Sequence, residues 1–185
     1  VMRLLENHDT DRFLLEDPEN LNVYKQAVTM LLTIPGIPQL YYGQELLMTG
    51  STKKDFGYVR PDMPGGWNGD EISVFQESGR TAMQQEAFNF MKKMLHWRKG
   101  NAAISKGKMK HFMPRSNVYV YERSYNGKSI LVIMNGVNKE VDLDLTFYKE
   151  VIGDRTNSKN VLTDSNVPLG KKLHLQPKEV LVLEL

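Results

Sequence analysis

The chain contains no cysteine among its 185 residues. Disulfide bonds and thiolate metal sites are therefore excluded, although the cellular compartment stays open. No apolar stretch approaches the ~20 residues that a membrane-spanning helix needs, and no secretory signal peptide is visible. The formal net charge is only +2, and the basic runs are pairs such as Lys53–Lys54. The composition thus gives no electrostatic reason to expect nucleic acid or an anionic membrane as a partner.

What is present is typical of a folded globular protein. Hydrophobic residues make up 41% and charged residues 25% of the chain, which are ordinary shares. The length allows one large domain or two small ones. Because the sequence begins at Val1 and enters directly into an apparent strand, we expect a fragment whose N-terminal part is missing. Periplasmic, secreted and cytoplasmic locations all stay open.

The first residues change abruptly from apolar to polar. The apolar residues among 1–5 predict a buried parallel strand, and Asn7, His8 and Asp9 follow where it ends. An amide, an imidazole and a carboxylate can bind the hydroxyl groups of a sugar. Alternatively, the same three residues form a turn, in which Asn7 or Asp9 caps the next helix.

A helix and a second strand follow this segment. Residues 17–19 (Asp-Pro-Glu) predict a helix start, and apolar residues from Leu21 to Leu32 continue at helical spacing. Pro35–Gly36 ends the helix, and residues 37–42 predict a short strand. A strand, a helix and a strand in this order indicate a βαβ unit and a parallel sheet.

Residues 46–80 are rich in glycine and proline and predict a long irregular loop, which in a folded domain is usually functional. Its most distinctive part is Arg60–Trp67, where Trp67 follows two glycines. The flat face of Trp67 could bind a sugar ring, or the side chain could close the loop over the core. Both interpretations stay open.

A second helix is predicted from Thr81 to Gly100. Thr81 and Gln84 have the spacing of a capping box, and Gly100 is a helix terminator. Methionine and phenylalanine residues line one face, which Phe88 and Trp97 broaden. This apolar stripe predicts a core-facing helix and not a cofactor site.

Residues 106–185 predict an all-β domain, which we interpret as an antiparallel sandwich of Greek-key type. Asn126–Gly127 lies between two strand-like runs and is a strong hairpin signal. His111 and His174 are isolated, and nothing in the domain resembles a catalytic constellation. No helical pattern is visible. The predicted strands are Val118–Arg123, Lys128–Met134, Glu140–Leu145, Lys172–Leu175 and Val180–Leu185.

Two motifs together resemble the alpha-amylase family of glycoside hydrolases. Residues 6–9 read Glu-Asn-His-Asp, and residues 36–45 read Gly-Ile-Pro-Gln-Leu-Tyr-Tyr-Gly-Gln-Glu. They resemble the ends of the family's seventh and eighth barrel strands. The segments His8–Phe13 and Arg60–Trp67 are more similar to the neopullulanase and cyclomaltodextrinase branch, and the closing β domain is similar to that family's C-terminal domain.

The resemblance implies an α/β part followed by an all-β part. Residues 1–105 would be the last two βα units of a (β/α)8 TIM barrel, and residues 106–185 the C-terminal β-sandwich domain. The family is retaining and uses a carboxylate nucleophile and a carboxylic acid. A third carboxylate holds the sugar, and the resemblance assigns this role to Asp9. The further candidates for sugar binding are Asn7, His8, Arg12, Tyr42, Glu45, Arg60 and Trp67.

The nucleophile and acid motifs of the family do not occur in this chain. We therefore expect it to be inactive by itself. We also expect that it either self-associates through its exposed sheet edge and apolar helix faces or is a piece cut from a larger protein. Glu6 and Glu45 are not substitutes, since Glu6 precedes the motif and Glu45 resembles a position that shapes the subsite. No cofactor and no metal ligand are expected here. No oxygen-rich calcium loop occurs in this chain. A calcium site in the missing N-terminal part stays open.

The expected partner is an alpha-glucan, such as pullulan, a cyclodextrin or a maltooligosaccharide. A glycosyl transferase on the same barrel is an alternative, because water and a sugar acceptor compete for one intermediate. A second alternative is a non-catalytic glucan-binding or structural module that uses the β domain and Trp67.

Overall fold

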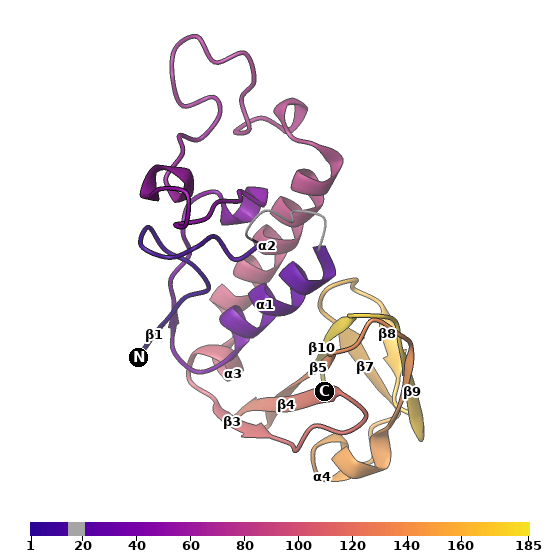
Figure 1. Ribbon diagram of the computed structural model, residues 1–185. Helices are drawn as coiled ribbons and strands as arrows, with labels where there is room; N and C mark the ends of the chain where they lie inside the picture. The colour runs from indigo at the N-terminus through magenta and orange to yellow at the C-terminus, as the bar shows by residue number, and fades with distance from the viewer. Residues whose placement is uncertain (15–20) are drawn as a thin grey trace. The chain divides into compact units, whose positions relative to one another are not determined.

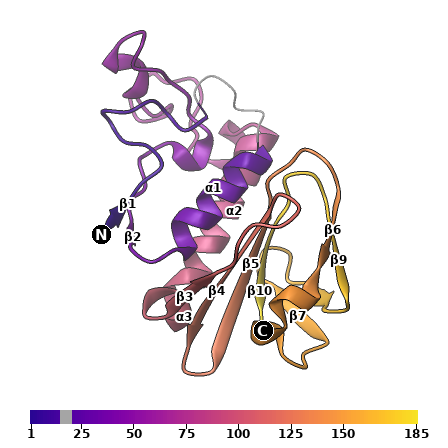
Figure 2. The ribbon, with the colours of Figure 1, turned by 60° about the horizontal axis from the view of Figure 1, so that its bottom comes forward.

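Two short parallel strands and the helix between them open the chain. In the computed structural model (Figure 1), which describes residues 1–14 and 21–185, β1 (Met2–Arg3) pairs in parallel with β2 (Ile37–Pro38) (Figure 2). Helix α1 (Leu21–Thr33) comes between them in the sequence. This confirms the expected order of strand, helix and strand. The predicted helix start at residues 17–19 lies outside the described residues.

Both strands are shorter and more exposed than the sequence suggested. Residues 39–42 are not in a strand, and the side chains expected to be buried in the first strand are open, with Val1 90% and Met2 64% exposed. Ile37 is likewise 69% exposed. The physical reason is that, among the described residues, each strand has one hydrogen-bonded neighbour and an open edge on its other side.

The chain folds as two units. One consists of Val1–Leu31 and Gly36–Lys93, and the other of Leu32–Pro35 and Met94–Leu185. In the first unit, residues 46–80 form the expected irregular segment, which contains only short 3-10 turns. These turns are η2 (Phe56–Val59) and η3 (Glu77–Gly79), and a further one, η1 (Gln44–Leu46), ends where the segment begins.

Helix α2 (Ala82–Gly100) begins at the predicted capping box. The backbone N–H of Thr81 donates to Gln84 Oε1 at 3.0 Å, and the backbone N–H of Gln84 donates to Thr81 Oγ1 at 3.2 Å. Met91 and Met94 on its apolar stripe are buried. Within the described residues, no helix combines the length and the apolar character that crossing a bilayer requires.

The second unit contains a six-stranded antiparallel sheet and a smaller two-stranded one (Figure 2). In the larger sheet β4, β5 and β10 lie side by side (Figure 2). The order of the larger sheet is β3 (Lys108–His111), β4 (Val118–Tyr125), β5 (Lys128–Asn135), β10 (Val180–Glu184), β7 (Asn157–Asn160) and β8 (Asn166–Pro168). The smaller sheet pairs β6 (Val141–Asp144) with β9 (Lys172–Leu175).

One apolar core lies between these two sheets. Leu131 and Leu183 of the larger sheet and Leu143 and Leu175 of the smaller one belong to the same buried cluster. The antiparallel β architecture expected for this region is thus present. The hairpin is also confirmed, because Asn126 and Gly127 both have positive φ, 48° and 77°, as a type I′ turn requires.

Some elements of the second unit were not predicted. Strands β3, β7 and β8 were missed, and the expectation of no helix was wrong. Helix α4 (Lys149–Ile152) and the 3-10 turn η4 (Leu145–Tyr148) contradict this expectation for residues 106–185, and the unpredicted α3 (Ala102–Ser105) precedes that range. They are too short to show a helical period in the sequence, and Asn101 and Asp144 cap α3 and η4 through their side-chain oxygens.

A buried arginine ties several segments of the second unit together. Arg123 on β4 is 1% exposed. Its guanidinium donates to the carbonyl oxygen of Ile104 at 2.9 Å, of Gly107 at 2.8 Å and of Lys108 at 3.2 Å, and also to that of Thr33. One side chain therefore satisfies carbonyl groups from several separate segments.

We predict that Arg123→Met lowers the free energy of unfolding by about 3 kcal/mol. Hydrogen bonds to a charged donor are worth ~1.5–3 kcal/mol each, and in this variant the carbonyl groups lose that donor. Urea unfolding measures this change. Arg115→Met is the matched control, since Arg115 is exposed and stacks on Phe147. Its loss should cost less than about 1 kcal/mol. Equal losses in both variants would contradict the assignment.

Candidate functional site

A tight turn follows the carboxyl end of β1. Asn7 Oδ1 accepts from the backbone N–H of Asp9 at 2.8 Å, and the backbone N–H of Asn7 donates to Thr10 Oγ1 at 3.0 Å. Asn7 thus shapes the turn by an Asx-type bond, as one of the two interpretations proposed. The turn directs the side chains of His8 and Asp9 outward, where both are more than half exposed.

The Asp9 carboxylate is held from two sides. His8 Nε2 lies 3.2 Å from Asp9 Oδ2, and Arg60 Nη2 donates to Asp9 Oδ1 at 3.0 Å. Arg60 Nε also donates to the carbonyl oxygen of His8 at 2.8 Å. Arg60 therefore bridges the turn and orients the carboxylate, although it is 51 residues away in the sequence.

A buried ion pair lies beneath this turn. Arg12 Nη1 donates to Glu6 Oε1 at 3.0 Å, and Glu6 Oε2 accepts from the backbone N–H of Phe13 at 2.6 Å. Arg12 is 0% and Glu6 2% exposed. The Arg12 guanidinium lies over the ring of Tyr41, 4.1 Å from its centroid. Its contacts favour a role in holding the turn.

Arg12 also fixes the segment that follows β2. Its Nη1 donates to the carbonyl oxygen of Tyr42 at 2.6 Å, and its Nε to that of Val59 at 3.1 Å. The hydroxyl of Tyr42 donates to the carbonyl oxygen of Pro61 at 2.8 Å. Tyr42, which is 39% exposed, is thereby joined to the loop that carries Arg60.

Within the described ranges, Trp67 and Glu45 are connected to Asp9 neither by a hydrogen bond nor by an ion pair. Trp67 is 67% exposed, and Asp70 Oδ2 holds its backbone N–H at 3.1 Å. The open side chain favours the interpretation of a presented ring. The charge of Glu45 instead affects Tyr24. Burial raises the pKa of Tyr24, and the charges of Glu45 and Glu6 raise it further.

Asp11 is a residue of the turn that sequence reasoning missed. Its Oδ1 accepts from the backbone N–H of Thr52 at 2.5 Å and from the Thr52 hydroxyl at 2.8 Å. These bonds, the backbone one first, lower the pKa of Asp11 below its ordinary value of 3.8. Asp11 thus ties the turn to the irregular segment. No local signal could reveal it, since Thr52 is far away in sequence.

The described part of the chain contains no cluster of three or more residues of the types that bind a metal ion. Around Asp9 the polar groups are instead one carboxylate, one imidazole and one guanidinium. This set is suited to hydrogen-bonding the hydroxyl groups of a neutral ligand.

Comparisons with known proteins show what this chain is similar to. Residues 109–184 match the model of the cyclo-malto-dextrinase C-terminal domain. A cyclomaltodextrinase of Thermoanaerobacter pseudethanolicus is 27% identical over 100% of this chain and 28% of its own length. A cyclomaltodextrin glucanotransferase of a Bacillus species is 32% identical over 88% of this chain and 21% of its own. The chain belongs to the alpha-amylase family of glycoside hydrolases.

The fold of this alpha-amylase family chain is also similar to that of solved relatives. An alpha-amylase of Geobacillus thermoleovorans, solved in complex with acarbose, superimposes with a TM-score of 0.73 over 100% of this chain and 38% of that one, at 22% identity. The chain spans only 28% and 21% of the two curated relatives described above.

We predict a pH-dependent stability contribution from Asp11. Because its pKa is lowered in the folded state, the contribution is complete above the unfolded pKa of 3.8 and is lost as the pH falls through the folded value. The stability difference between the protein and its Asp11→Asn variant should shrink from neutral pH to about pH 3. Urea midpoints measure it, with Asp154→Asn as the surface-charge control. A constant difference would refute this assignment.

Proposed function

We propose that this chain is the C-terminal part of a retaining glycoside hydrolase that cleaves alpha-glucosidic bonds in starch-type glucans. Residues 1–105 supply the last two βα units of a (β/α)8 barrel, and residues 106–185 the C-terminal β-sandwich domain. The parallel pairing of β1 and β2 supports this proposal, because such barrels repeat parallel βαβ units. The small share of each relative that the chain spans supports a larger enzyme.

The placement of Asp9 carries the catalytic part of the proposal. Its carboxylate follows the carboxyl end of a parallel strand, is 62% exposed and is oriented by His8 and Arg60. Barrel enzymes of this type place their catalytic groups at the carboxyl ends of the strands. An acceptor held in this way can bind substrate hydroxyl groups without first being reordered.

Retaining hydrolysis assigns a distinct task to each carboxyl group. One carboxylate attacks the anomeric carbon while a carboxylic acid protonates the leaving oxygen, and water then hydrolyses the glycosyl-enzyme. In this proposal Asp9 accepts hydrogen bonds from the sugar next to the scissile bond, and His8 contacts the same sugar. Such bonds strengthen in the transition state. The nucleophile and the acid come from other strands of the barrel, so the chain alone is inactive.

The remaining candidates take supporting or binding roles in the proposed site. Arg60 orients Asp9 and borders the sugar, while Arg12 acts from beneath through Tyr42. Trp67 offers its exposed ring to a sugar face. Glu45 shapes the neighbouring subsite, and Asn7 maintains the turn while its amide N–H groups remain as donors.

A glycosyl transferase is the second candidate function. It is favoured by the 32% identity to a cyclomaltodextrin glucanotransferase, against 27% to a cyclomaltodextrinase. Both reactions use one glycosyl-enzyme intermediate and differ in the acceptor, which is water or a sugar hydroxyl. The matched C-terminal domain model, which is named for the cyclomaltodextrinases, leads us to place hydrolysis first.

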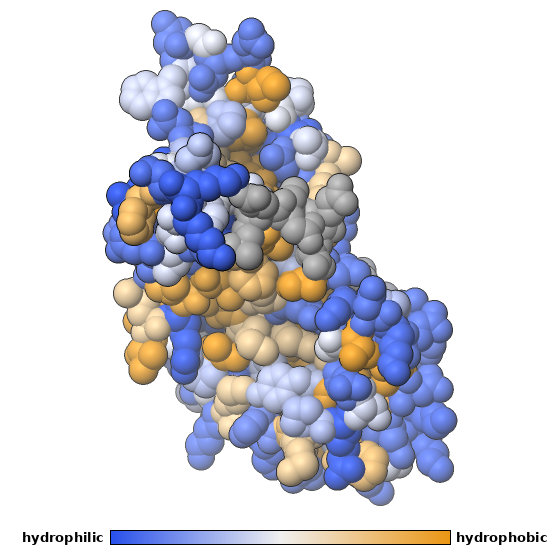
Figure 3. Space-filling view, viewed as in Figure 1, coloured by the Kyte–Doolittle hydropathy of each residue, from blue (hydrophilic) through white to orange (hydrophobic). Residues whose placement is uncertain are grey.

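We also propose that the chain self-associates through the open strands β1 and β2. Val1, Met2 and Ile37 are strongly exposed there, and Figure 3 shows apolar surface where Figure 1 marks the N-terminus. Apolar patches beside unpaired strand edges favour association.

We predict that Asp9→Asn lowers kcat about 1,000-fold in the complete enzyme, because several kcal/mol of transition-state stabilisation are lost. Release of reducing sugar from maltotriose measures the rate, and an unchanged urea midpoint shows that the variant folds. Asp62→Asn, an exposed carboxylate near Arg60, is the control and should keep full activity. An Asp9→Asn enzyme that keeps its activity would defeat the proposed role.

The isolated chain should form dimers or larger species as its concentration rises, and Met2→Lys with Ile37→Lys should restore monomers, because two charges repel a second edge. Light scattering measures the mass. Met113→Lys is the matched control, since Met113 is 81% exposed in the other unit, and it should not change the mass. A monomer at all concentrations would contradict self-association.

A further inference from the structure

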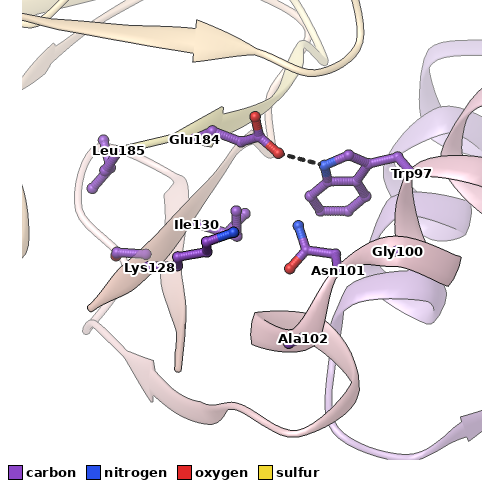
Figure 4. A pocket seen from close by; sticks show the side chains of 9 residues that line it. Trp97, Gly100, Asn101, Ala102, Lys128, Ile130, Glu184 and Leu185 are labelled. Carbon is purple, nitrogen blue, oxygen red and sulfur yellow. Dashed lines mark hydrogen bonds between the residues drawn. The ribbon is translucent and has the colours of Figure 1, made fainter. Parts of the chain in front are cut away.

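A polar and aromatic pocket lies in the second unit, and none of its lining residues belongs to the proposed active site. It has a volume of about 480 Å³, which falls within the ~300–1,000 Å³ of small-molecule sites. The pocket lies between the end of α2, the start of α3, the first residues of β5 and the end of the chain. Its lining includes Trp97, Asn101, Lys128 and Glu184 (Figure 4).

Trp97 forms one wall of this pocket, and its orientation is fixed. Its indole Nε1 donates to Glu184 Oε1 at 2.7 Å, a short bond to a charged acceptor. The side chain is only partly buried. The polar edge of the ring is thus occupied by Glu184, and its flat apolar surface borders the pocket (Figure 4). A fixed aromatic surface can stack against another flat or apolar face.

The other polar groups surround the same space. Asn101 Oδ1 accepts from the backbone N–H of Ala103 at 3.0 Å and caps α3, so its Nδ2 amide, drawn toward Trp97 in Figure 4, serves as a donor. Lys128 adds an ammonium donor, and the Glu184 carboxylate has a second oxygen as an acceptor. The charges of Lys128 and Glu184 offset each other, which favours a neutral ligand over an anionic one.

We propose that this pocket is a second carbohydrate site, which binds one pyranose ring of an alpha-glucan. A pyranose has an apolar C–H face for the indole of Trp97 and hydroxyl groups for Asn101, Lys128 and Glu184. The chemistry of the pocket selects a pyranose, while the choice of an alpha-glucan rests on the proposed function. The site would hold a long glucan on the second unit and leave the bond-cleaving site free.

Nuclear magnetic resonance tests this proposal directly on the full chain. The sequence has two tryptophans, so Trp67→Phe assigns the two indole N–H signals. Titration with maltotriose should shift the Trp97 signal until it saturates, both in the unchanged chain and in the Asp9→Asn variant. Cellobiose should shift the same signal less. An unmoved Trp97 signal, or a shift with adenosine monophosphate and none with maltotriose, would overturn the proposal. An equal response to cellobiose would overturn the choice of alpha-glucan.

Matched variants distinguish binding from a structural tether between α2 and β10. Lys128→Met and Asn101→Ser, the latter keeping a capping hydroxyl, should each weaken maltotriose binding up to about tenfold. Lys171→Met, another exposed lysine outside the pocket, should not. Equal affinity in all three variants would overturn the site. Activity retained in Asp9→Asn would defeat the proposed function alone, since the Trp97 titration needs no turnover.

Discussion

The buried ion pair between Glu6 and Arg12 is the constraint on which the candidate site depends. Its two side chains are almost fully inaccessible, and Arg12 reaches the carbonyl groups of Tyr42 and Val59. Replacing such a pair by apolar residues can be neutral, but removing one partner leaves a buried charge and typically costs ~3–5 kcal/mol. The main effect of the Glu6–Arg12 ion pair is therefore positional, because the pair determines where the turn of Asp9 meets the segment that carries Arg60.

The ion pair also explains why Asp9 can be exposed and still oriented. An exposed ion pair contributes little to stability by itself, so Arg60 alone would hold the carboxylate weakly. The turn beneath it is fixed by Glu6 and Arg12, and the loop is fixed by the bond from Tyr42 to Pro61. The buried groups thus bring the turn and the loop close together, and Asp9 and Arg60 need only form the ion pair between them.

Local patterns predicted much of the fold. The capping bonds of Thr81 and Gln84, and the turn at Asn126 and Gly127, depend on residues that are close in sequence. Strand β7 was missed for the opposite reason, because its sequence Asn-Ser-Lys-Asn is polar throughout. It is defined by its neighbours β10 and β8. Such tertiary context overrides local propensity.

The candidate site likewise has features that the local sequence predicts and features that it does not. The position of His8 and Asp9 after a strand could be predicted, because a change from apolar to polar residues is a local signal. The pairing of Asp9 with Arg60 and the bond of Asp11 to Thr52 join residues that are 51 and 41 apart, and no spacing rule reaches so far. Arg12 was expected to bind sugar, whereas its burial favours a positioning role.

The two proposed carbohydrate sites differ in how firmly the chain itself determines them. The Trp97 pocket is formed by elements of one unit, and its aromatic wall is held by a bond to Glu184 within that unit. The Asp9 site orients an acceptor, but retaining chemistry needs two further carboxyl groups. Orientation of a sugar by Asp9 can accelerate a reaction only where those groups are present. Glucan binding at Trp97 is therefore separable from catalysis, and one chain can have the first property without the second.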